Sequence, residues 1–508
     1  MRKLKMQTMK NRLLVSVMTY LTFSLVHAYD AQINGIYYNL DNHAKTAEVT
    51  YGESRTAATY KGSVVIPTSV TYSGNRYAVT AIGSDAFYNC RELTSLTLPS
   101  SINKITGSFT FANCLNLEAV HISDLEAWCN ISFTDAASNP LYKNYTKAAL
   151  YLNGELVKDL VIPDGVTTIS DYAFVYFGND NLSRGATVTI PNSVTTIGKY
   201  AFWQSGMYAL KLGENILEIG DFAFYNCTNL QTIDLPKKLT TIGQYAFGGC
   251  YSVTSLVIPD NVATINEGAF SNMSRLASIK LPKGLTAISN YAFSGLESLT
   301  LLEIPEGVKT IGEGAIQTNR KMASVVIPSS VESIGQYAFF NCMSLKDVNC
   351  KAKSVPTASE NTFYLYEDAT LHVPAASASL YEEAEPWKNF KAVVPLDDIQ
   401  EKQQCSIPTI EIVNGRLKLS CETEGVIFKT SFSFEGGNGT AEGDDIPIAA
   451  TTICHFNVYA TKEGYYDSET VTKDITVNIG IGENGDINTD GIINVSDIVG
   501  LTKIILQK

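Results

Sequence analysis

The chain has 508 residues, of which 45% are hydrophobic and 18% are charged, so most of it is expected to fold around a buried core. Its formal charge of −13 argues against nucleic acids and anionic membrane surfaces as partners. After the first segment no apolar run approaches 18 residues, so the sequence predicts no membrane span.

Residues 1–28 have the pattern of a secretory signal peptide. Basic residues precede Leu13, an apolar run extends to Val26, and Ala28 is a small residue at the cleavage position. Removing the five cations of this segment would take the charge to about −18. Because the first cysteine, Cys90, lies far from the cut, we expect an exported protein, secreted or at the cell surface, without a lipid anchor.

A repeat of about 23 residues organises residues 67–396, after a predicted N-terminal cap at residues 29–66. Prolines recur at 23-residue intervals, and an Ala-Phe pair recurs in step with them. The clearest copies contain Pro259, Pro282, Pro305 and Pro328, with Phe224, Phe247, Phe270 and Phe293. Alternating residues such as Leu256-Val257-Ile258 predict a short strand, which the proline ends because it has no amide hydrogen.

The segment after the proline has a different spacing. Ile242, Ala246, Cys250 and Val253 follow one another in steps of four, four and three, which predicts one face of a short helical turn. Gly243 is expected where the chain bends into that turn. One unit cannot bury its own apolar face, whereas stacked units can. The pattern therefore predicts a leucine-rich repeat solenoid of short strands and short helical turns.

The repeated signature I-P-x-x-V-x-x-I-G-x-x-A-F-x-x-C resembles that of the BspA-like leucine-rich repeat family of bacterial surface proteins. The resemblance covers roughly Ile33 to Leu396. The start of this range is similar to the N-terminal cap of that family, and the segment from Leu371 to Phe390 is similar to its C-terminal cap. The resemblance implies a surface protein that binds host matrix proteins or other cells.

The period is interrupted between Phe111 and Phe174, which are 63 residues apart. Asp124 is placed to cap a short helix in this insertion. The insertion carries Trp128, Tyr142, Tyr145 and Tyr151. Insertions into solenoids often lie on one face and bind, and rings with polar tips suit binding patches. These four residues are a candidate binding surface; the alternative is that they close the core over the irregular turn.

Cysteine and asparagine each recur at a fixed position of the repeat. The two sets are Cys90, Cys114, Cys227, Cys250 and Cys342, and Asn89, Asn113, Asn226, Asn272 and Asn341. Thiols on neighbouring turns would come within disulfide range, but parallel stacked side chains rarely have the required geometry, so we expect small buried thiols. The asparagine side chains are expected to bond turn backbone groups.

After the repeats, residues 397–404 are polar and predict a linker. Short alternating runs such as Thr409 to Ile412, separated by Gly- and Asp-rich turns, predict a small all-β sandwich over residues 405–478. The run from Asn457 to Tyr465 resembles the immunoglobulin-like domain at the C-terminus of chitobiases. That resemblance implies a spacer or accessory role.

Residues 482–508 contain a twelve-residue loop with the spacing of an EF-hand. Its glycine, Gly491, permits the sharp turn, and oxygen-bearing residues recur at the positions that hold Ca²⁺. The candidate ligands are Asp486, Asn488, Asp490, Ile492, Asn494 and Asp497. The sequence therefore predicts a Ca²⁺ site followed by a helix with Ile498, Leu501 and Ile505 on one side.

This loop resembles one repeat of a type I dockerin, in which Asp at position 12 is the rule. The resemblance implies docking to a cohesin-like partner, with Val495 and Ser496 at the recognition positions. Dockerins carry two such repeats and this chain has one. It therefore stays open whether the half module docks a partner or only stabilises the C-terminus.

The sequence has no nucleophile-elbow, zinc-protease or phosphate-loop motif, so no enzyme is expected. The favoured function is a non-catalytic binding protein outside the cell, adhering to host matrix proteins or other cells through the solenoid surface. Its partners would be proteins or glycans. The alternative is an accessory or scaffold subunit of a glycan-degrading assembly, docked through the dockerin-like tail.

Overall fold

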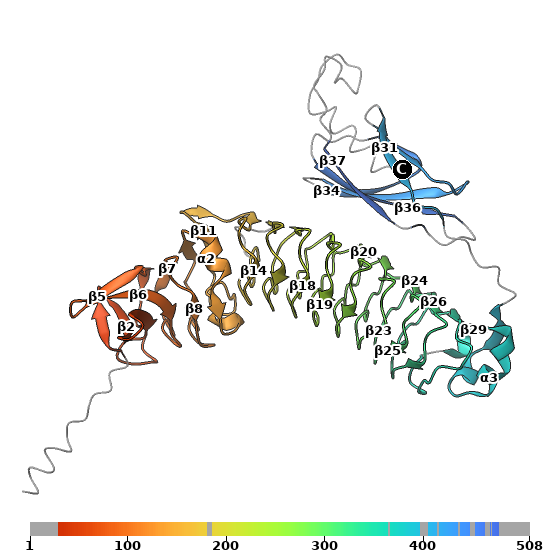
Figure 1. Ribbon diagram of the computed structural model, residues 1–508, viewed down its shortest axis with the longest axis horizontal. Helices are drawn as coiled ribbons and strands as arrows, with labels where there is room; N and C mark the ends of the chain where they lie inside the picture. Colours follow the sequence, from red (N-terminus) through yellow and green to blue (C-terminus); the bar gives the residue numbers. More distant parts are fainter. Residues whose placement is uncertain are drawn as a thin grey trace, which may run out of the picture. The chain divides into compact units, whose positions relative to one another are not determined.

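The computed structural model describes residues 29–179, 185–363 and 366–396, and then 405–413, 416–434, 437–447, 453–462, 468 and 470–476. The predicted signal peptide, the linker and the calcium loop with Val495 and Ser496 lie outside the described residues. The chain divides into two compact units, residues 1–396 and 397–508, and each is described by itself (Figure 1).

A mainly antiparallel sheet begins the first unit. Its strands are β1 (Ala31–Ile33), β2 (Ile36–Asp41), β3 (Thr46–Thr50), β5 (Ser69–Tyr72) and β6 (Asn75–Ile82). β2 pairs antiparallel with β1 and β3, and β5 forms a hairpin with β6, whereas β3 and β6 are parallel. The hairpin lies beyond residue 66, and β6 passes the sheet on to the first parallel strand of the repeats. These strands cover the end of the solenoid core.

One row of parallel strands forms the first side of each coil. In β20 (Ser255–Val257) and β22 (Ser278–Lys280), Leu256 lies beside Ile279 in parallel register. β20 ends two residues before Pro259, as the lack of an amide hydrogen requires. The other strands of this row are β4 (Gly62–Val65), β7 (Leu93–Thr97), β9 (Ala119–Ile122), β11 (Ala149–Leu152), β13 (Leu160–Val161), β15 (Thr187–Thr189), β17 (Ala209–Lys211), β24 (Leu301–Glu303), β26 (Ser324–Ile327), β28 (Asp347–Cys350), β29 (Thr370–Val373) and β30 (Ala392–Pro395).

A second row contains parallel strands of two residues each, and its isoleucines point into the core. Ile219, for example, pairs with Ile242 and both are fully buried. The strands are β8 (Lys104–Ile105), β10 (Ser132–Phe133), β14 (Thr168–Ile169), β16 (Thr196–Ile197), β18 (Glu218–Ile219), β19 (Thr241–Ile242), β21 (Thr264–Ile265), β23 (Ala287–Ile288), β25 (Thr310–Ile311) and β27 (Ser333–Ile334). In Figure 1 both rows run along the length of the unit, with strands recurring from coil to coil.

The third side of each coil consists of turns, so the predicted helical turn is wrong. Tyr245 has a φ of 50°, which a right-handed helix excludes. The amide of Phe247 donates to Ala269 O of the next coil at 2.8 Å, whereas the amide of Gly248 donates to Tyr245 O at 3.1 Å. Amides therefore alternate between the next coil and the same turn. The four positions behind the prediction are nevertheless all buried.

Gly243 has a different role from the predicted bend. Its φ is not positive, but a Cβ there would lie 2.5 Å from the backbone nitrogen of Asp221 in the preceding coil. Gly335 meets the backbone of Glu313 in the same way, at 2.6 Å. The glycine is required because two coils approach closely at this corner.

The recurring asparagines share a backbone conformation rather than a side-chain bond. All five have a positive φ, between 57° and 62°. Gly249 and Gly295 occupy the equivalent position in other coils, each with a φ of 74°. Asparagine is enriched in the left-handed region, which explains its recurrence. Asn89 fits the predicted role, because its Nδ2 donates to Thr56 O at 3.3 Å.

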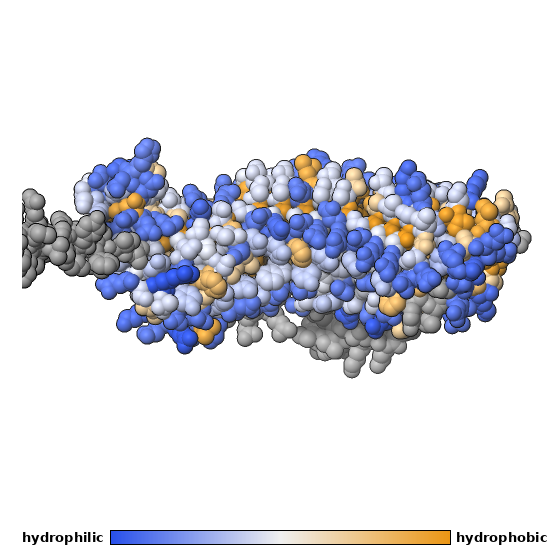
Figure 2. Space-filling model, turned by 90° about the horizontal axis from the view of Figure 1, so that it is seen from below, coloured by the Kyte–Doolittle hydropathy of each residue, from blue (hydrophilic) through white to orange (hydrophobic). Residues whose placement is uncertain are grey.

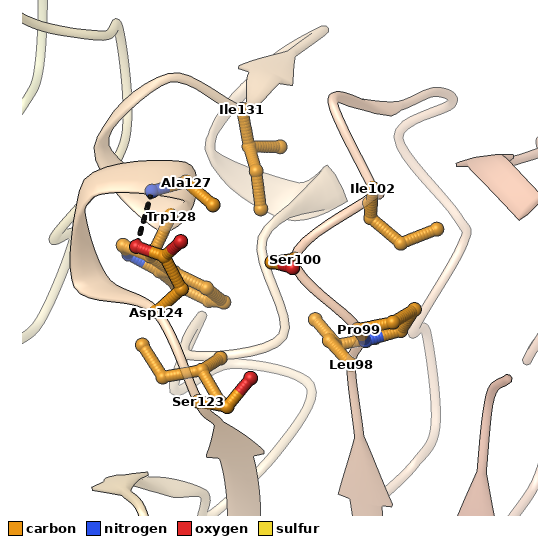
Figure 3. Close-up of a pocket in the computed structure, with 10 residues that line it drawn as sticks. Leu98, Pro99, Ser100, Ile102, Ser123, Asp124, Ala127, Trp128 and Ile131 are labelled. Carbon is orange, nitrogen blue, oxygen red and sulfur yellow. Dashed lines mark hydrogen bonds between the residues drawn. The ribbon is translucent and has the colours of Figure 1, made fainter. Parts of the chain in front are cut away.

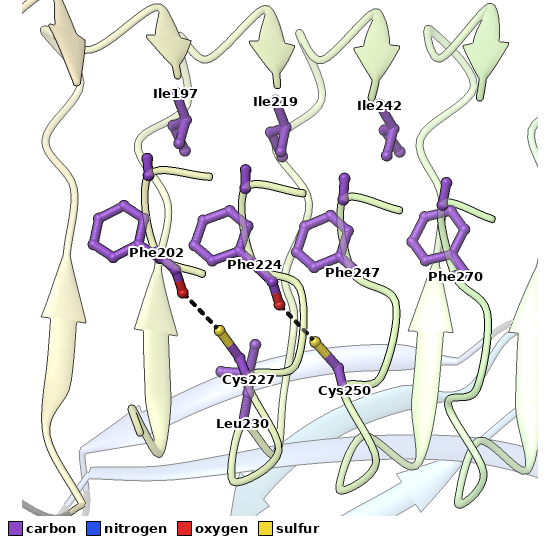
Figure 4. Packing of buried hydrophobic residues seen from close by; sticks show 14 of the residues in the cluster. Ile197, Phe202, Ile219, Phe224, Cys227, Leu230, Ile242, Phe247, Cys250 and Phe270 are labelled. Carbon is purple, nitrogen blue, oxygen red and sulfur yellow. Dashed lines mark hydrogen bonds between the residues drawn. The ribbon is translucent and has the colours of Figure 1, made fainter. Parts of the chain in front are cut away.

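A ladder of phenylalanines forms the centre of the core, as the repeat predicts. The rings of Phe202, Phe224 and Phe247 are fully buried and stack at centroid distances of 5.2 Å (Figure 4). The thiol of Cys227 donates to Phe202 O at 3.2 Å, and that of Cys250 donates to Phe224 O at 3.4 Å. The recurring cysteines are free and buried, which confirms the prediction of stacked thiols.

Short helices and buried aromatic residues close the C-terminal end of this unit. Trp387 and Tyr381 are fully buried, and Trp387 Nε1 donates to Pro356 O at 2.9 Å. Phe363 continues the ring ladder from Phe339 at 5.1 Å. The elements are η2 (Tyr366–Asp368), η3 (Ala375–Ser377), α3 (Ala378–Glu383) and η4 (Trp387–Asn389). Large buried rings thus replace the next coil as cover for the core.

The described residues of the second unit form two antiparallel sheets. One sheet has the order β31-β32-β35 and the other β34-β33-β36-β37. The strands are β31 (Thr409–Val413), β32 (Arg416–Ser420), β33 (Ile427–Phe434), β34 (Gly437–Glu442), β35 (Asp445–Pro447), β36 (Ile453–Thr461) and β37 (Val471–Thr476). Leu417, Phe428 and Val458 belong to a buried cluster that is separate from the core of the first unit. Across the described residues of both units, no helix is long and apolar enough to cross a membrane.

Candidate functional site

Two columns of aromatic side chains run along the turn side of successive coils. One column occupies the residue before the Ala-Phe pair, and the other follows that pair. With two tyrosines of the insertion they form one continuous set of ring contacts, which we call the aromatic strip. Its members are Tyr142, Tyr145, Tyr172, Tyr176, Tyr200, Trp203, Phe222, Tyr225 and Tyr245. All are partly exposed except Tyr176, which is buried.

The first column has an unusual backbone conformation. Tyr172, Tyr200, Phe222 and Tyr245 have φ values of 63°, 56°, 55° and 50°. This left-handed conformation costs a residue with a Cβ on the order of 1 kcal/mol or more. Gly268 takes the same position in the next coil without that cost. The same position is left-handed in each later coil, including Tyr291 at 55° and Tyr337 at 60°, so the conformation belongs to the repeat, and what distinguishes the strip is an aromatic residue in four successive coils.

The rings of the first column stack on one another. The centroids of Tyr172 and Tyr200 are 5.1 Å apart, those of Tyr200 and Phe222 are 4.7 Å apart, and those of Phe222 and Tyr245 are 5.2 Å apart. The rings are nearly parallel because adjacent coils repeat at about the 4.8 Å spacing of paired strands. Stacking covers the ring faces, so a partner meets mainly ring edges and tyrosine hydroxyls.

Glycines in the next coil determine where the rings lie. A Cβ on Gly268 would lie 2.2 Å from Cε1 of Tyr245, so the tyrosine ring covers this glycine and the stack ends there. Gly248 similarly leaves space for Tyr225, whose Cδ2 would lie 3.0 Å from an added Cβ. The Tyr245 hydroxyl donates to Glu267 Oε1 at 3.3 Å. Ring positions are therefore fixed by the neighbouring backbone.

The insertion adds its rings to one end of the strip. Tyr142 lies 6.3 Å from Trp203 and 5.6 Å from Tyr176, measured between ring centroids, and 5.1 Å from Tyr145. The buried Asn139 fixes this segment, since its Nδ2 donates to Tyr172 O at 2.8 Å and to Ala173 O at 3.1 Å. The insertion is thus bound to the backbone that carries the first ring of the stack.

Charged side chains flank the stacked rings. The residue before each stacked ring is Asp171, Lys199, Asp221 or Gln244. Asp221 Oδ1 accepts a hydrogen bond from the amide of Gln244 at 2.8 Å, and its other oxygen lies 3.7 Å from Lys199 Nζ. Lys199 Nζ also lies over the Tyr200 ring, 5.7 Å from its centroid. With Glu267, the border of the strip is mainly acidic.

Burial keeps several of the phenols neutral. Burial raises the pKa of Tyr176 to about 12, and burial followed by the charge of Glu267 raises the pKa of Tyr245. The pKa of Tyr172 is also raised, mainly by burial. These hydroxyls therefore stay protonated at physiological pH; that of Tyr245 already donates to Glu267 and Tyr176 is buried, so of the three it is Tyr172 that can donate to a partner.

Trp128 does not belong to the candidate surface, which corrects the prediction. Its side chain is 1% exposed, and its Nε1 donates to Ala173 O at 3.0 Å. It lies on α2 (Leu125–Cys129), which Asp124 caps by accepting from the Ala127 amide at 3.0 Å (Figure 3). The cavity beside Trp128 has a volume of about 10 Å³, space for one water molecule at most. An indole whose N–H finds a carbonyl partner can be buried completely.

Tyr151 lies apart from the strip. It is on β11, which forms a hairpin with β12 (Glu155–Leu156), and its ring contacts His121 at 4.8 Å. The structure thus brings Tyr142 and Tyr145 together with seven rings from the coils, and it separates them from Trp128 and Tyr151. η1 (Ala136–Ser138) precedes the two strip tyrosines within the insertion.

The seven rings from the coils were missed by the sequence interpretation. Their signal is the recurrence of aromatic residues on either side of the Ala-Phe pair, as in Tyr200 and Trp203 around Phe202. The calcium ligands predicted from Asp486 to Asp497 lie outside the described residues, and within the described part no group of three potential metal ligands gathers.

Figure 2 shows one face of the protein, on which hydrophilic residues predominate and strongly apolar residues form separate patches. Tyrosine and tryptophan combine an apolar ring with a polar tip. Rings of this kind can remain partly exposed until a partner covers them.

Comparisons place the coiled unit among known proteins. A family model described as the BspA type leucine-rich repeat region matches in six copies, over residues 67–139, 145–277 and 240–370. Tyr142 falls in the short gap between the first two matched segments. No curated protein matches the chain significantly.

Several solved structures are similar to this chain. A leucine-rich repeat protein from Bacteroides ovatus is 24% identical, with a TM-score of 0.46 over 73% of this chain and 80% of that chain. A leucine-rich cell surface protein from Faecalibacterium prausnitzii is 25% identical, with a TM-score of 0.40 over 63% and 94% of the two chains. The pneumococcal vaccine antigen PcpA is 20% identical, with a TM-score of 0.47 over 72% and 98%.

Proposed function

Because the chain belongs to the BspA-type leucine-rich repeat family, whose members are typically non-catalytic binding proteins that are secreted or at the surface, we propose that it binds other proteins outside the cell through the aromatic strip. The observation that carries this proposal is the continuous contact of nine rings along one side, eight of them partly exposed. Tyrosine and tryptophan are enriched among the residues that dominate protein interfaces.

The rings of the strip are held in fixed positions before a partner binds. Its rings are fixed by stacking, by glycines in the adjacent coil and by the bound insertion, so few rotamers are lost when a partner covers them. Covering partly exposed rings removes apolar area from water, at about 25 cal/mol for each Å². Rigid aromatic anchors with polar tips therefore give affinity without a deep pocket.

For the target, we propose host matrix proteins or the surfaces of other cells. The pattern of residues 1–28 supports export, and the family supports a surface role. The second unit would serve as a spacer or accessory domain, in line with its resemblance to the immunoglobulin-like domain of chitobiases.

The test replaces strip residues with residues that the chain itself uses at the same repeat position. Trp203 and Tyr225 correspond to Ser271 and Ser294 in later coils, so Trp203→Ser with Tyr225→Ser preserves a permitted surface. Binding of the full chain to immobilised matrix proteins should weaken by about tenfold or more. Tyr151→Ser, a partly exposed ring outside the strip, is the matched control. Equal binding by the double variant and the native chain would remove the strip from the proposed function.

A second candidate function rests on the loop from Asp486 to Asp497. Its EF-hand spacing and dockerin-like sequence favour Ca²⁺ binding and attachment to a cohesin-like partner in a glycan-degrading assembly. Asp486→Ala with Asp490→Ala should abolish Ca²⁺ uptake measured by calorimetry, because two carboxylate ligands are lost. Asp444→Ala, an exposed acidic residue outside the loop, should leave uptake unchanged. Undiminished uptake by the double variant would exclude this site.

A further inference from the structure

We infer that the aromatic strip takes a cationic, arginine- or lysine-bearing segment of its partner protein. This inference rests on the proposed function and names the chemistry of the same site. The acidic border provides the first argument. Asp171, Asp221 and Glu267 lie beside the rings, against two cations: Lys199, and Lys143 of the insertion, whose ammonium group donates to Ala148 O at 2.5 Å. The whole chain carries a formal charge of −13, which attracts the same class of partner from a distance.

The chain itself contains a cation in this setting. Lys199 Nζ lies 5.7 Å from the centroid of the Tyr200 ring and 3.7 Å from an Asp221 carboxylate oxygen. Both side chains of that ion pair are about two-fifths exposed, at 46% for Lys199 and 39% for Asp221. The Asp221 carboxylate attracts this cation, whereas both faces of the Tyr200 ring are already covered by neighbouring rings. The other carboxylates of the border have neutral donors: Asp171 accepts a hydrogen bond from the amide of Lys199, and Glu267 accepts one from the Tyr245 hydroxyl.

The stacking favours a protein over a glycan. Sugar rings bind aromatic side chains by lying on a free ring face, and the faces of Tyr200 and Phe222 are both covered by neighbours at 5.2 Å or less. A guanidinium group can instead donate two hydrogen bonds to a carboxylate beside the strip, while the apolar stem of its arginine lies against the ring edges. A basic peptide segment therefore fits this arrangement, and a neutral polysaccharide does not.

The geometry also sets the length of the segment. The four stacked rings extend over about 15 Å, from the three centroid distances between neighbours. An extended chain advances about 3.3 Å for each residue, so about five residues pass along the stack. A labelled peptide of about eight residues, alternating arginine and glycine, is a suitable probe, and the same peptide with glutamate is its control.

The first experiment measures fluorescence anisotropy of these peptides with the full chain. The arginine peptide should bind and the glutamate peptide should not, and affinity should fall as salt approaches about 0.15 M. Asp221→Asn with Glu267→Gln should weaken binding by about tenfold. The asparagine is structurally safe, because Asn290 already accepts the equivalent amide, that of Glu313, at 2.8 Å in another coil. Two charge-matched changes elsewhere, Glu155→Gln with Asp347→Asn, should leave affinity unchanged. Equal losses in both double variants would reduce the effect to net charge and overturn the inference.

The internal lysine gives an independent result. Lys199→Gln frees the Asp221 carboxylate from its exposed ion pair, so the arginine peptide should bind about two- to threefold more tightly. Lys211→Gln removes an exposed cation from β17 instead, and should have no effect. No gain from Lys199→Gln relative to Lys211→Gln would count against a cation site at the Asp221 carboxylate.

Failure of this inference can be told from failure of the proposed function. If matrix proteins still bind the Asp221→Asn, Glu267→Gln variant but not the Trp203→Ser, Tyr225→Ser variant, the strip is the binding surface and its partner is not basic. If a soluble neutral glucan competes with matrix proteins for the strip, the partner is a glycan and the inference is wrong. If neither double variant affects matrix binding, the proposed function itself fails.

Discussion

At the scale of single residues, one buried position accepts several side chains that share a property. Cys227 and Cys250 donate their thiol to the carbonyl of a ring residue in the preceding coil. Ser205 does so with its hydroxyl at 2.6 Å, and Asn319 with its amide at 3.1 Å. Met273 and Leu296 fill the same position in other coils without such a donor, so the position accepts a small donor or an apolar side chain and does not require a redox-active thiol. Cysteine suits it because its size and low polarity also fill the apolar core.

These thiols should be unreactive in the folded chain. Burial raises the pKa of Cys250 from 9.0 to about 12 and raises that of Cys227 well above its ordinary value. Since the thiolate is the reactive form, a disulfide reagent at pH 8 should label neither residue until urea unfolds the chain. Cys421, which is partly exposed, is an internal comparison for access. Rapid labelling of Cys250 in the native chain would contradict the buried position.

The same pKa shift predicts how stability depends on pH. A thiol whose pKa is raised on folding holds its proton more tightly in the folded state. Its stabilising contribution is complete below the unfolded value near 9 and is lost as the pH rises toward about 12. The apparent Tm should therefore fall between pH 9 and 12, and less so in Cys250→Ser. Identical slopes for the two chains would show that Cys250 does not contribute.

At the scale of the coil, the sequence predicts the strands and the core because both depend on a pattern that repeats. It does not predict the turn side, where a four-residue spacing of buried side chains imitates a helix. The left-handed residue at Tyr245 breaks any helix, and in sequence nothing distinguishes it from an ordinary tyrosine. The insertion was partly predicted: Tyr142 and Tyr145 are on the strip, whereas Trp128 is in the core. The indole N–H of Trp128 donates to the carbonyl of Ala173, which is distant in sequence. Such a contact depends on how the two segments pack, and the sequence does not show this.

Two glycine substitutions separate backbone strain from ring displacement. Gly268 has a φ of 61° and an added Cβ would overlap Tyr245, whereas Gly154 has a φ of 88° with nothing within 4 Å. Gly154→Ala should lower the unfolding free energy by about 1 kcal/mol, because only the strain of a positive φ opposes it. Gly268→Ala should cost about 1–2 kcal/mol more, because the tyrosine ring must move. Apparent Tm values from calorimetry check both. Equal losses would show that Tyr245 does not lie firmly over Gly268.

At the scale of the whole molecule, stability comes from contacts between neighbouring coils, whereas the proposed binding surface extends over several coils. Each coil contacts mainly its neighbours, so the core of the first unit is a stack of nearest-neighbour interfaces. The strip uses that regularity, since one column of residues becomes a continuous surface only when coils stack in register. Its specificity arises where the regular pattern changes, at the insertion and at Gly268.

The two buried clusters predict two unfolding transitions. The first unit and the second unit each have their own apolar core, so a substitution in one should shift only its own transition. Phe247→Ala removes a fully buried ring from the ladder and should cost about 3–5 kcal/mol in the first unit. Phe247→Ile should cost less, because Ile316 occupies that position naturally. Leu417→Ala should lower only the second transition, by about 2–5 kcal/mol in its unfolding free energy.

Differential scanning calorimetry measures the shift of each transition, and hydrogen exchange assigns each transition to one of the two units. A shift of both transitions by either single substitution would mean that the two cores unfold as one cooperative unit.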